Sequence, residues 1–211
     1  MPSLLLLQTL INLRIKSLLI TSPTRAYFNQ NLLTQPKPSI ATTNFSLFVP
    51  PLLTFLDTTS TPTRSRALTI LTTFLPLLTP KLLTETGLGS VFEDAITPTL
   101  LFLPTITPVD ESVQLLNAAY EALLVLGSIL YAGDGKGEKE LRFWDDMMRK
   151  GVFAGYAHSS DYPAIVQVLL QEMGRVIEKM GVSAVKHLKV LSPSPFTPFH
   201  IFCKRRSDEQ H

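Results

Sequence analysis

Residues 50–71 contain two short apolar segments joined by a polar turn, and this arrangement constrains the fold more than any other feature of the chain. The first segment ends at Asp57, the turn is rich in Thr and Ser, and the second segment opens with Pro62 and Arg64. Two amphipathic helices joined this closely lie antiparallel, and neither can bury its apolar stripe alone. Because such a hairpin needs neighbours, the sequence predicts an all-α fold built from stacked helical repeats, a kind of scaffold that binds proteins.

The composition excludes several classes of protein. The chain has 211 residues, of which 45% are apolar and only 17% are charged, and its net charge is +2. A charge this small gives no electrostatic reason to expect nucleic-acid binding. Cys203 is the sole cysteine, so an internal disulfide framework and a cysteine-based zinc site are excluded, and a reducing compartment is expected.

The amino-terminal 44 residues allow two interpretations. The apolar run that starts at Leu4 is interrupted by Gln8 and Asn12, well short of the roughly 20 residues that a membrane span needs. No acidic residue precedes Asp57, which is typical of a mitochondrial presequence. The preferred interpretation is a repeat helix over residues 3–20 followed by a Pro/Ser/Thr loop. The predicted organisation is therefore a remnant of a larger solenoid at 1–44, a helical domain at 45–191 and an irregular Pro-rich, basic tail at 192–211.

Apolar spacing and the positions of proline and glycine predict the remaining helices. Eight or nine helices are expected, in pairs at about residues 45–77, 81–103, 109–150 and 163–191. The third pair includes a helix from Glu138 to about Lys150 that ends before Gly151, and Gly181 ends the helix that starts at Pro163. Thr-Pro pairs at 61–62, 79–80 and 107–108 predict N-caps followed by proline at the first helical position. One apolar face of the helix that follows Thr107 consists of Val113, Leu116, Tyr120, Leu123, Gly127 and Leu130.

No set of residues has the spacing of a known catalytic or metal site. The histidines do not form an H-E-x-x-H motif, and the segment from His158 to Asp161 is better explained as the loop before Pro163. The glycine-rich segment at 133–137 lacks the spacing of a phosphate-binding loop. Carboxylates at 93, 94, 110 and 111 are interpreted as helix-start residues stabilised by the helix dipole. The sequence predicts no catalytic residue, no cofactor, no metal and no enzymatic activity.

A basic segment near the carboxyl end has two interpretations. Lys186, His187 and Lys189 are expected on a short helix whose apolar side carries Val185 and Leu188. The basic residues form either a solvated face or a charged patch that contacts an acidic segment of a partner protein.

The hairpin resembles a HEAT repeat, with Pro51 in the first helix, Asp57 at the turn, and Arg64 or Arg66 early in the second helix. The segments that follow are similar to the Tel-Two-interacting protein two family. They are residues 82–95 (LLTETGLGSVFEDA), Pro98, Pro104, 107–112 (TPVDES), 119–124 (AYEALL), Gly151, 156–158 (YAH), Pro163 and 181–189 (GVSAVKHLK). The similarity spans about residues 45–190, and the Thr/Pro/Leu-rich style resembles a filamentous-fungal member.

The resemblance implies a HEAT-like solenoid that serves as a subunit of the triple-T complex. With two partner subunits, such a protein acts as a co-chaperone that works with Hsp90 to mature and stabilise phosphatidylinositol-3-kinase-related kinases. It implies a non-catalytic protein of cytoplasm and nucleus that binds neither nucleic acid nor membrane. Candidate partner contacts are a loop containing Tyr156 and His158, and the segment carrying Lys186, His187 and Lys189.

Two departures from the family pattern, a short amino end and the Pro-rich tail from Ser192, predict a truncated member. Two other functions stay open at this point. The hairpin alone would also suit a generic HEAT-like adaptor in trafficking or transport. The acid-free amino end would also suit a helical protein imported into an organelle.

Overall fold

The computed structural model describes residues 48–132 and 137–187, and within these ranges the chain is helical and contains no strand. The predicted all-α class is therefore confirmed. The chain divides into two compact units, one of Met1–Thr99 with Asn117–Gly133 and one of Leu100–Leu116 with Asp134–His211. The predicted helix at 3–20, the tail at 192–211 and most of the glycine-rich loop lie outside the described residues. The borders of the predicted domains lie there too and stay predictions.

The first unit opens with the predicted hairpin. A helix over residues 48–56 leads through a turn into α4 (Thr61–Phe74), which continues into η1 (Leu75–Leu77). Pro50 and Pro51 lie in the first helix near its start, where proline is tolerated because the early backbone N–H groups have no partner within the helix. The N-cap of α4 is Ser60 rather than Thr61, one residue earlier than predicted.

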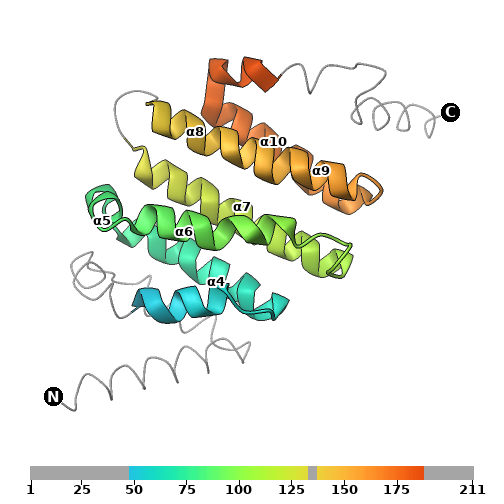
Figure 1. The fold of residues 1–211 in the computed structure, drawn as a ribbon, viewed down its shortest axis with the longest axis horizontal. Helices are drawn as coiled ribbons and strands as arrows, with labels where there is room; N and C mark the ends of the chain where they lie inside the picture. Colours follow the sequence, from blue (N-terminus) through green and yellow to red (C-terminus); the bar gives the residue numbers. More distant parts are fainter. Residues whose placement is uncertain (1–47, 133–136, 188–211) are drawn as a thin grey trace, which may run out of the picture. The chain divides into compact units, whose positions relative to one another are not determined.

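Two short helices complete the described part of this unit before α7. They are α5 (Pro80–Glu85), which packs on α6 (Leu88–Ile96), and both are visible in Figure 1. The predicted cap at Thr79 is confirmed, because its hydroxyl accepts a hydrogen bond of 3.2 Å from the backbone N–H of Leu82. Gly87 connects the two helices with a φ of 71°, a left-handed conformation that glycine adopts without steric cost. After α6 the 3-10 helix η2 (Thr97–Leu101) crosses into the second unit.

The long helix α7 (Val109–Leu130) confirms the predicted helix and its apolar face. Leu116, Tyr120, Leu123 and Gly127 are buried, while Val113 and Leu130 are half-buried. The helix is long and apolar enough to cross a membrane by composition alone, but half of its most apolar window is buried inside the protein. Core helices of soluble proteins meet the same criterion, so this helix gives no support to a membrane role.

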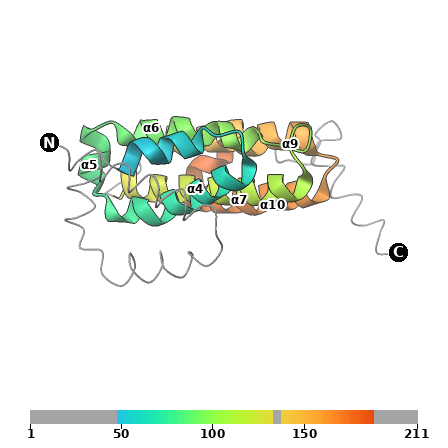
Figure 2. The same cartoon turned by 90° about the horizontal axis from the view of Figure 1, so that it is seen from below.

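In the second unit, one helical rod packs along α10. The rod consists of α8 (Glu138–Asp146), η3 (Met147–Phe153) and α9 (Ala154–Ser159). Figures 1 and 2 both show α9 beside α10 (Pro163–Met180), and α10 contacts all three parts of the rod. Gly181 ends α10 with a φ of 57°, as predicted, and the 3-10 helix η4 (Gly181–His187) follows.

The prediction that a helix ends before Gly151 is wrong. The backbone passes through this glycine in a π-helix, so α8 and α9 are continuous. Glycine costs about 1 kcal/mol in a helix interior relative to alanine. Here Met147, Met148 and Val152 are buried on the same π-helix, and their burial outweighs that cost. Single π-turns often occur at functional sites, and this one lies next to the side-chain cluster described below.

Candidate functional site

The basic segment predicted as a partner contact lies on η4, with its faces reversed relative to the prediction. His187 is 3% exposed and Ala184 is 8% exposed, whereas Val185 is 58% exposed. In a 3-10 helix the residues i and i+3 share a face, so Ala184 and His187 point inward while Val182 and Val185 point outward. The prediction that Val185 lies on the buried side is therefore wrong, because it assumed the period of an α-helix.

The charged partner of this segment is a carboxylate of the same chain. The Lys186 Nζ and the His187 Nε2 each lie 2.8 Å from Oδ1 of Asp145. The Arg149 Nε donates a hydrogen bond of 3.0 Å to Oδ2 of Asp145. The ring of Phe153 meets the His187 imidazole edge-on, with 5.5 Å between centroids. We call these five residues the Asp145 cluster, which holds η4 against α8 and η3.

The electrostatics of the cluster favour a charged carboxylate and a neutral imidazole. Burial would by itself raise the pKa of Asp145, but Lys186 and then Arg149 outweigh it, so the pKa lies below its usual value. Burial is also the largest influence on His187, and it lowers the pKa of the imidazole despite the opposing charge of Asp145. Lys186 lowers that pKa further. His187 is therefore neutral at pH 7 and acts as a packed polar side chain rather than as a cation.

The depressed pKa of His187 predicts that acid weakens the fold. The unfolded chain binds a proton at this histidine below the ordinary pKa of 6.5, whereas the folded chain does not. The free energy of unfolding should therefore fall as the pH drops below 6.5, until the folded pKa is reached. One proton contributes at most about 1.4 kcal/mol per pH unit. Urea titrations between about pH 7.5 and pH 5 measure this dependence.

The matched control for this prediction is His187→Gln, which keeps a polar group near the position of Nε2 and cannot titrate. The slope of stability against pH should be shallower in this variant than in the natural chain. Equal slopes in the two proteins would show that His187 does not carry the pH dependence.

The other predicted contact residues lie on α9 rather than in a loop, so the predicted loop at Tyr156–His158 is wrong. Tyr156 is 4% exposed and therefore offers no side-chain surface to a partner, whereas His158 is exposed. Neither residue takes part in the contacts that define the Asp145 cluster. Lys189 lies outside the described residues. Of the five predicted residues, the structure brings Lys186 and His187 together on one carboxylate.

Asp145, Arg149 and Phe153 complete the cluster, and none of the three was among the predicted contact residues. The sequence does contain one signal, because Asp145 and Asp146 stand four residues before Arg149 and Lys150, the spacing of helical ion pairs. That spacing explains the contacts along the helix. It carries no information about η4, whose approach to Asp145 depends on the tertiary packing of the unit.

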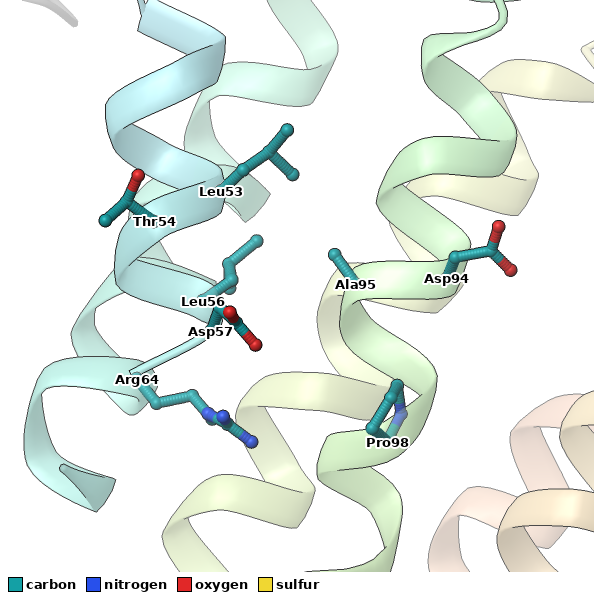
Figure 3. A pocket seen from close by; sticks show the side chains of 8 residues that line it. All are labelled: Leu53, Thr54, Leu56, Asp57, Arg64, Asp94, Ala95 and Pro98. Atoms are coloured by element: carbon teal, nitrogen blue, oxygen red, sulfur yellow. The ribbon is translucent and has the colours of Figure 1, made fainter. Parts of the chain in front are cut away.

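A pocket of about 460 Å³ lies beside the hairpin turn in the first unit (Figure 3). Arg64 is 7% exposed, and its Nε donates a hydrogen bond of 3.0 Å to the carbonyl of Thr58 across the turn. Burial lowers the pKa of Arg64, and the nearby Asp57 opposes that shift. The arginine predicted to mark the hairpin therefore stabilises its own turn. The pocket is lined by Leu53, Thr54, Leu56, Asp57, Arg64, Asp94, Ala95 and Pro98.

The bounds of α6 correct one interpretation of the acidic residues. Glu93 and Asp94 lie near the carboxyl end of α6, not at a helix start. Asp110 and Glu111 do lie in the first turn of α7, as predicted.

Within the described ranges, no group of three or more His, Cys, Asp or Glu side chains is placed to hold a metal ion. Ser159 is buried without a hydrogen-bond partner for its hydroxyl, while the neighbouring His158 is exposed, so these two side chains form no nucleophile–base pair.

Replacing Arg64 by methionine should lower the free energy of unfolding by about 1.5–3 kcal/mol, since a hydrogen bond from a charged donor is lost at a buried position. Methionine keeps the apolar stem, so the change mainly removes the donor. Chemical denaturation measures the effect. The matched control is Arg66→Met, on the exposed side of the same helix turn, which should change stability by about 0.5 kcal/mol or less. Similar losses in both variants would contradict the role assigned to Arg64.

The comparison with protein families gives one match. A family model described as the Tti2 family matches residues 28–197, which is more than half of the chain. No curated protein and no solved structure matches this chain. The match contains the hairpin, the Arg64 pocket and the Asp145 cluster, together with all the segments that carry the sequence resemblance. The chain therefore belongs to the Tti2 family, which is the Tel-Two-interacting protein two family.

Proposed function

We propose that this chain is a non-catalytic scaffold subunit of the triple-T co-chaperone complex. In this role it joins two partner subunits, and the assembly works with Hsp90 to mature and stabilise phosphatidylinositol-3-kinase-related kinases. The observation that carries the proposal is the family match over residues 28–197. The all-helical fold is consistent with a scaffold, because stacked helices present long surfaces for protein binding.

The proposed architecture is a HEAT-like solenoid of antiparallel helix pairs. The support comes from one hairpin. The helix at 48–56 and α4 form the predicted hairpin, and a hydrogen bond from the buried Arg64 stabilises the turn between them. Location in cytoplasm and nucleus is part of the proposal and rests on the family resemblance alone.

Affinity purification of the tagged full chain from its native host tests this function. Quantitative mass spectrometry should recover the two other triple-T subunits at levels comparable to the tagged chain, together with large kinases and Hsp90. The control is the untagged strain purified in parallel. A well-expressed chain that recovers neither subunit would overturn the proposal.

The same purification separates the proposal from the two other functions. Recovery of coat or transport proteins in place of the triple-T subunits would favour a generic adaptor. A fluorescent tag at the carboxyl end that marks mitochondria would favour an imported protein.

A further inference from the structure

The pocket beside the hairpin turn combines apolar walls with charged groups. Its volume of about 460 Å³ falls within the range of about 300–1,000 Å³ that is typical of ligand-binding pockets. Leu53 and Leu56 form the apolar wall on the hairpin side, and Ala95 and Pro98 form the wall on the side of α6 and η2 (Figure 3). All of these residues belong to the first unit. The pocket can therefore accept an apolar group between two elements of one unit.

The charged groups of the pocket leave one negative charge uncompensated. Asp57 and Asp94 are exposed, and within the described ranges neither forms a salt bridge or a side-chain hydrogen bond. The lining contains one cation, Arg64, whose guanidinium donates a hydrogen bond to the carbonyl of Thr58. The charge of Asp57 acts on Arg64, so two carboxylates and one guanidinium give the pocket a net charge of −1. One further cation would make the pocket neutral.

The same chain contains an occupant with this chemistry. Lys37 is the nearest cation before the hairpin in the sequence, and no acidic residue precedes Asp57. Lys37 stands between Pro36 and Pro38. A residue that precedes proline favours an extended backbone, and proline has little conformational freedom to lose on binding. The two proline rings and the apolar stem of lysine are complementary to the apolar walls, and the ammonium group is complementary to the carboxylates.

The segment is long enough to reach the pocket. Lys37 precedes Phe48 by eleven residues, which span up to about 36–40 Å when extended. The helix from Phe48 to the pocket at Asp57 rises only about 14 Å. Attachment to the hairpin gives the segment an effective concentration on the order of millimolar at the pocket, which favours it over a lysine of a separate chain. Arg25, the next cation toward the amino end, stands twelve residues further away and has no proline beside it.

We propose that residues 36–38 dock in this pocket, with Lys37 beside Asp57 and Asp94 and with the proline rings against the apolar walls. The docked segment contacts both the hairpin and α6, so it stabilises the packing of these two elements. The inference does not depend on the proposed function, because it concerns contacts within one chain.

Carbodiimide cross-linking of the full chain tests this contact, because the reagent joins an amine to a carboxylate when the two groups touch. We expect mass spectrometry to find a link between Lys37 and Asp57 or Asp94, and its yield should fall at high salt. The positive control in the same sample is the link between Lys186 and Asp145, whose charged atoms lie 2.8 Å apart. Formation of the control link without any link from Lys37 would overturn the inference.

An equal mixture of chains labelled with nitrogen-14 and nitrogen-15 separates contact within one chain from contact between two copies. The link from Lys37 should join peptides of the same label. Links of mixed label at the statistical frequency would assign the pocket to a second copy and would overturn the inference. A link from Lys16 in place of Lys37 would overturn it as well.

The variant Lys37→Met measures the effect of docking on the chain between the segment and the hairpin. Phe45 lies in this stretch of the sequence, and chymotrypsin should cleave after it about threefold faster or more in the variant, because proteolysis follows the population of the open form. Asp94→Asn should raise the rate in the same way. The matched control is Arg25→Met, which should leave the rate unchanged. Equal rates in the natural chain and in Lys37→Met, or an equal increase in Arg25→Met, would contradict the assignment to Lys37.

Discussion

Replacing Trp144 by alanine is expected to lower the free energy of unfolding by about 3–5 kcal/mol, the largest effect of any single substitution considered for this chain. Trp144 is 1% exposed, and its ring lies edge-on against Phe143 with 4.9 Å between centroids. Its Nε1 donates a hydrogen bond of 3.2 Å to Oε1 of Glu140. Truncation leaves a large cavity that neighbouring helices can fill only in part. Since domains are stable by about 5–15 kcal/mol, this loss would remove a large share of the stability.

Urea titration followed by circular dichroism measures this loss, because the variant no longer contains the chain's sole tryptophan. Two matched variants separate the contribution of ring packing from that of the hydrogen bond. Trp144→Phe keeps most of the ring volume and should recover most of the stability, whereas Glu140→Gln keeps an acceptor for Nε1 and should cost little. A loss below about 1 kcal/mol for Trp144→Ala would contradict the packing of the second unit.

Replacing Asp145 by alanine is expected to cost about 2–3 kcal/mol. The carboxylate is 17% exposed, so the contacts that it makes are partly shielded from water. Its loss leaves the buried His187 beside an empty position and removes the group that holds Lys186. Removing one partner of a buried polar contact costs more than the contact contributes, because the remaining group has lost its water. The effect should appear as loosening of η4.

Asp146 provides the matched control for this substitution. It stands next to Asp145 in the sequence and pairs with Lys150, but it is 45% exposed, and such surface pairs contribute about 0.5 kcal/mol. The fluorescence of Trp144, one residue from Asp145, reports unfolding of the second unit in both variants. Limited proteolysis should cut Asp145→Ala near residue 187 faster than Asp146→Ala. Equal stability and equal cleavage of the two variants would contradict the conclusion that the Asp145 cluster holds η4 in place.

The helices could be predicted from the sequence because their signals are local. The apolar face of α7, the cap at Thr79 and the stop at Gly181 each depend on residues within one or two turns, and the structure confirms all three. The prediction of a helix end before Gly151 was wrong because tertiary packing, and not a local signal, decides the structure there. Glycine is a local signal for a helix end, but burial of the neighbouring side chains by α10 outweighs that signal.

The candidate sites could be predicted only in part. The sequence predicts that Arg64 or Arg66 marks the hairpin, because that signal is local, and the structure assigns the contact with the turn to Arg64. The role of Lys186 and His187 depends on Asp145, about forty residues earlier, and on the 3-10 geometry of η4. An α-helical period places Val185 inside and the histidine outside, whereas the observed geometry does the reverse. The exposure of Val182 and Val185 therefore could not be predicted from the sequence.

We propose that this chain stabilises phosphatidylinositol-3-kinase-related kinases as part of a co-chaperone complex. Rapid depletion of the chain in its native host, followed by quantification of each kinase and its transcript, tests this most directly. Kinase protein levels should fall while their transcripts stay constant, and re-expression of the natural chain should restore the protein levels. Kinase levels that remain unchanged through several generations after complete depletion would contradict it.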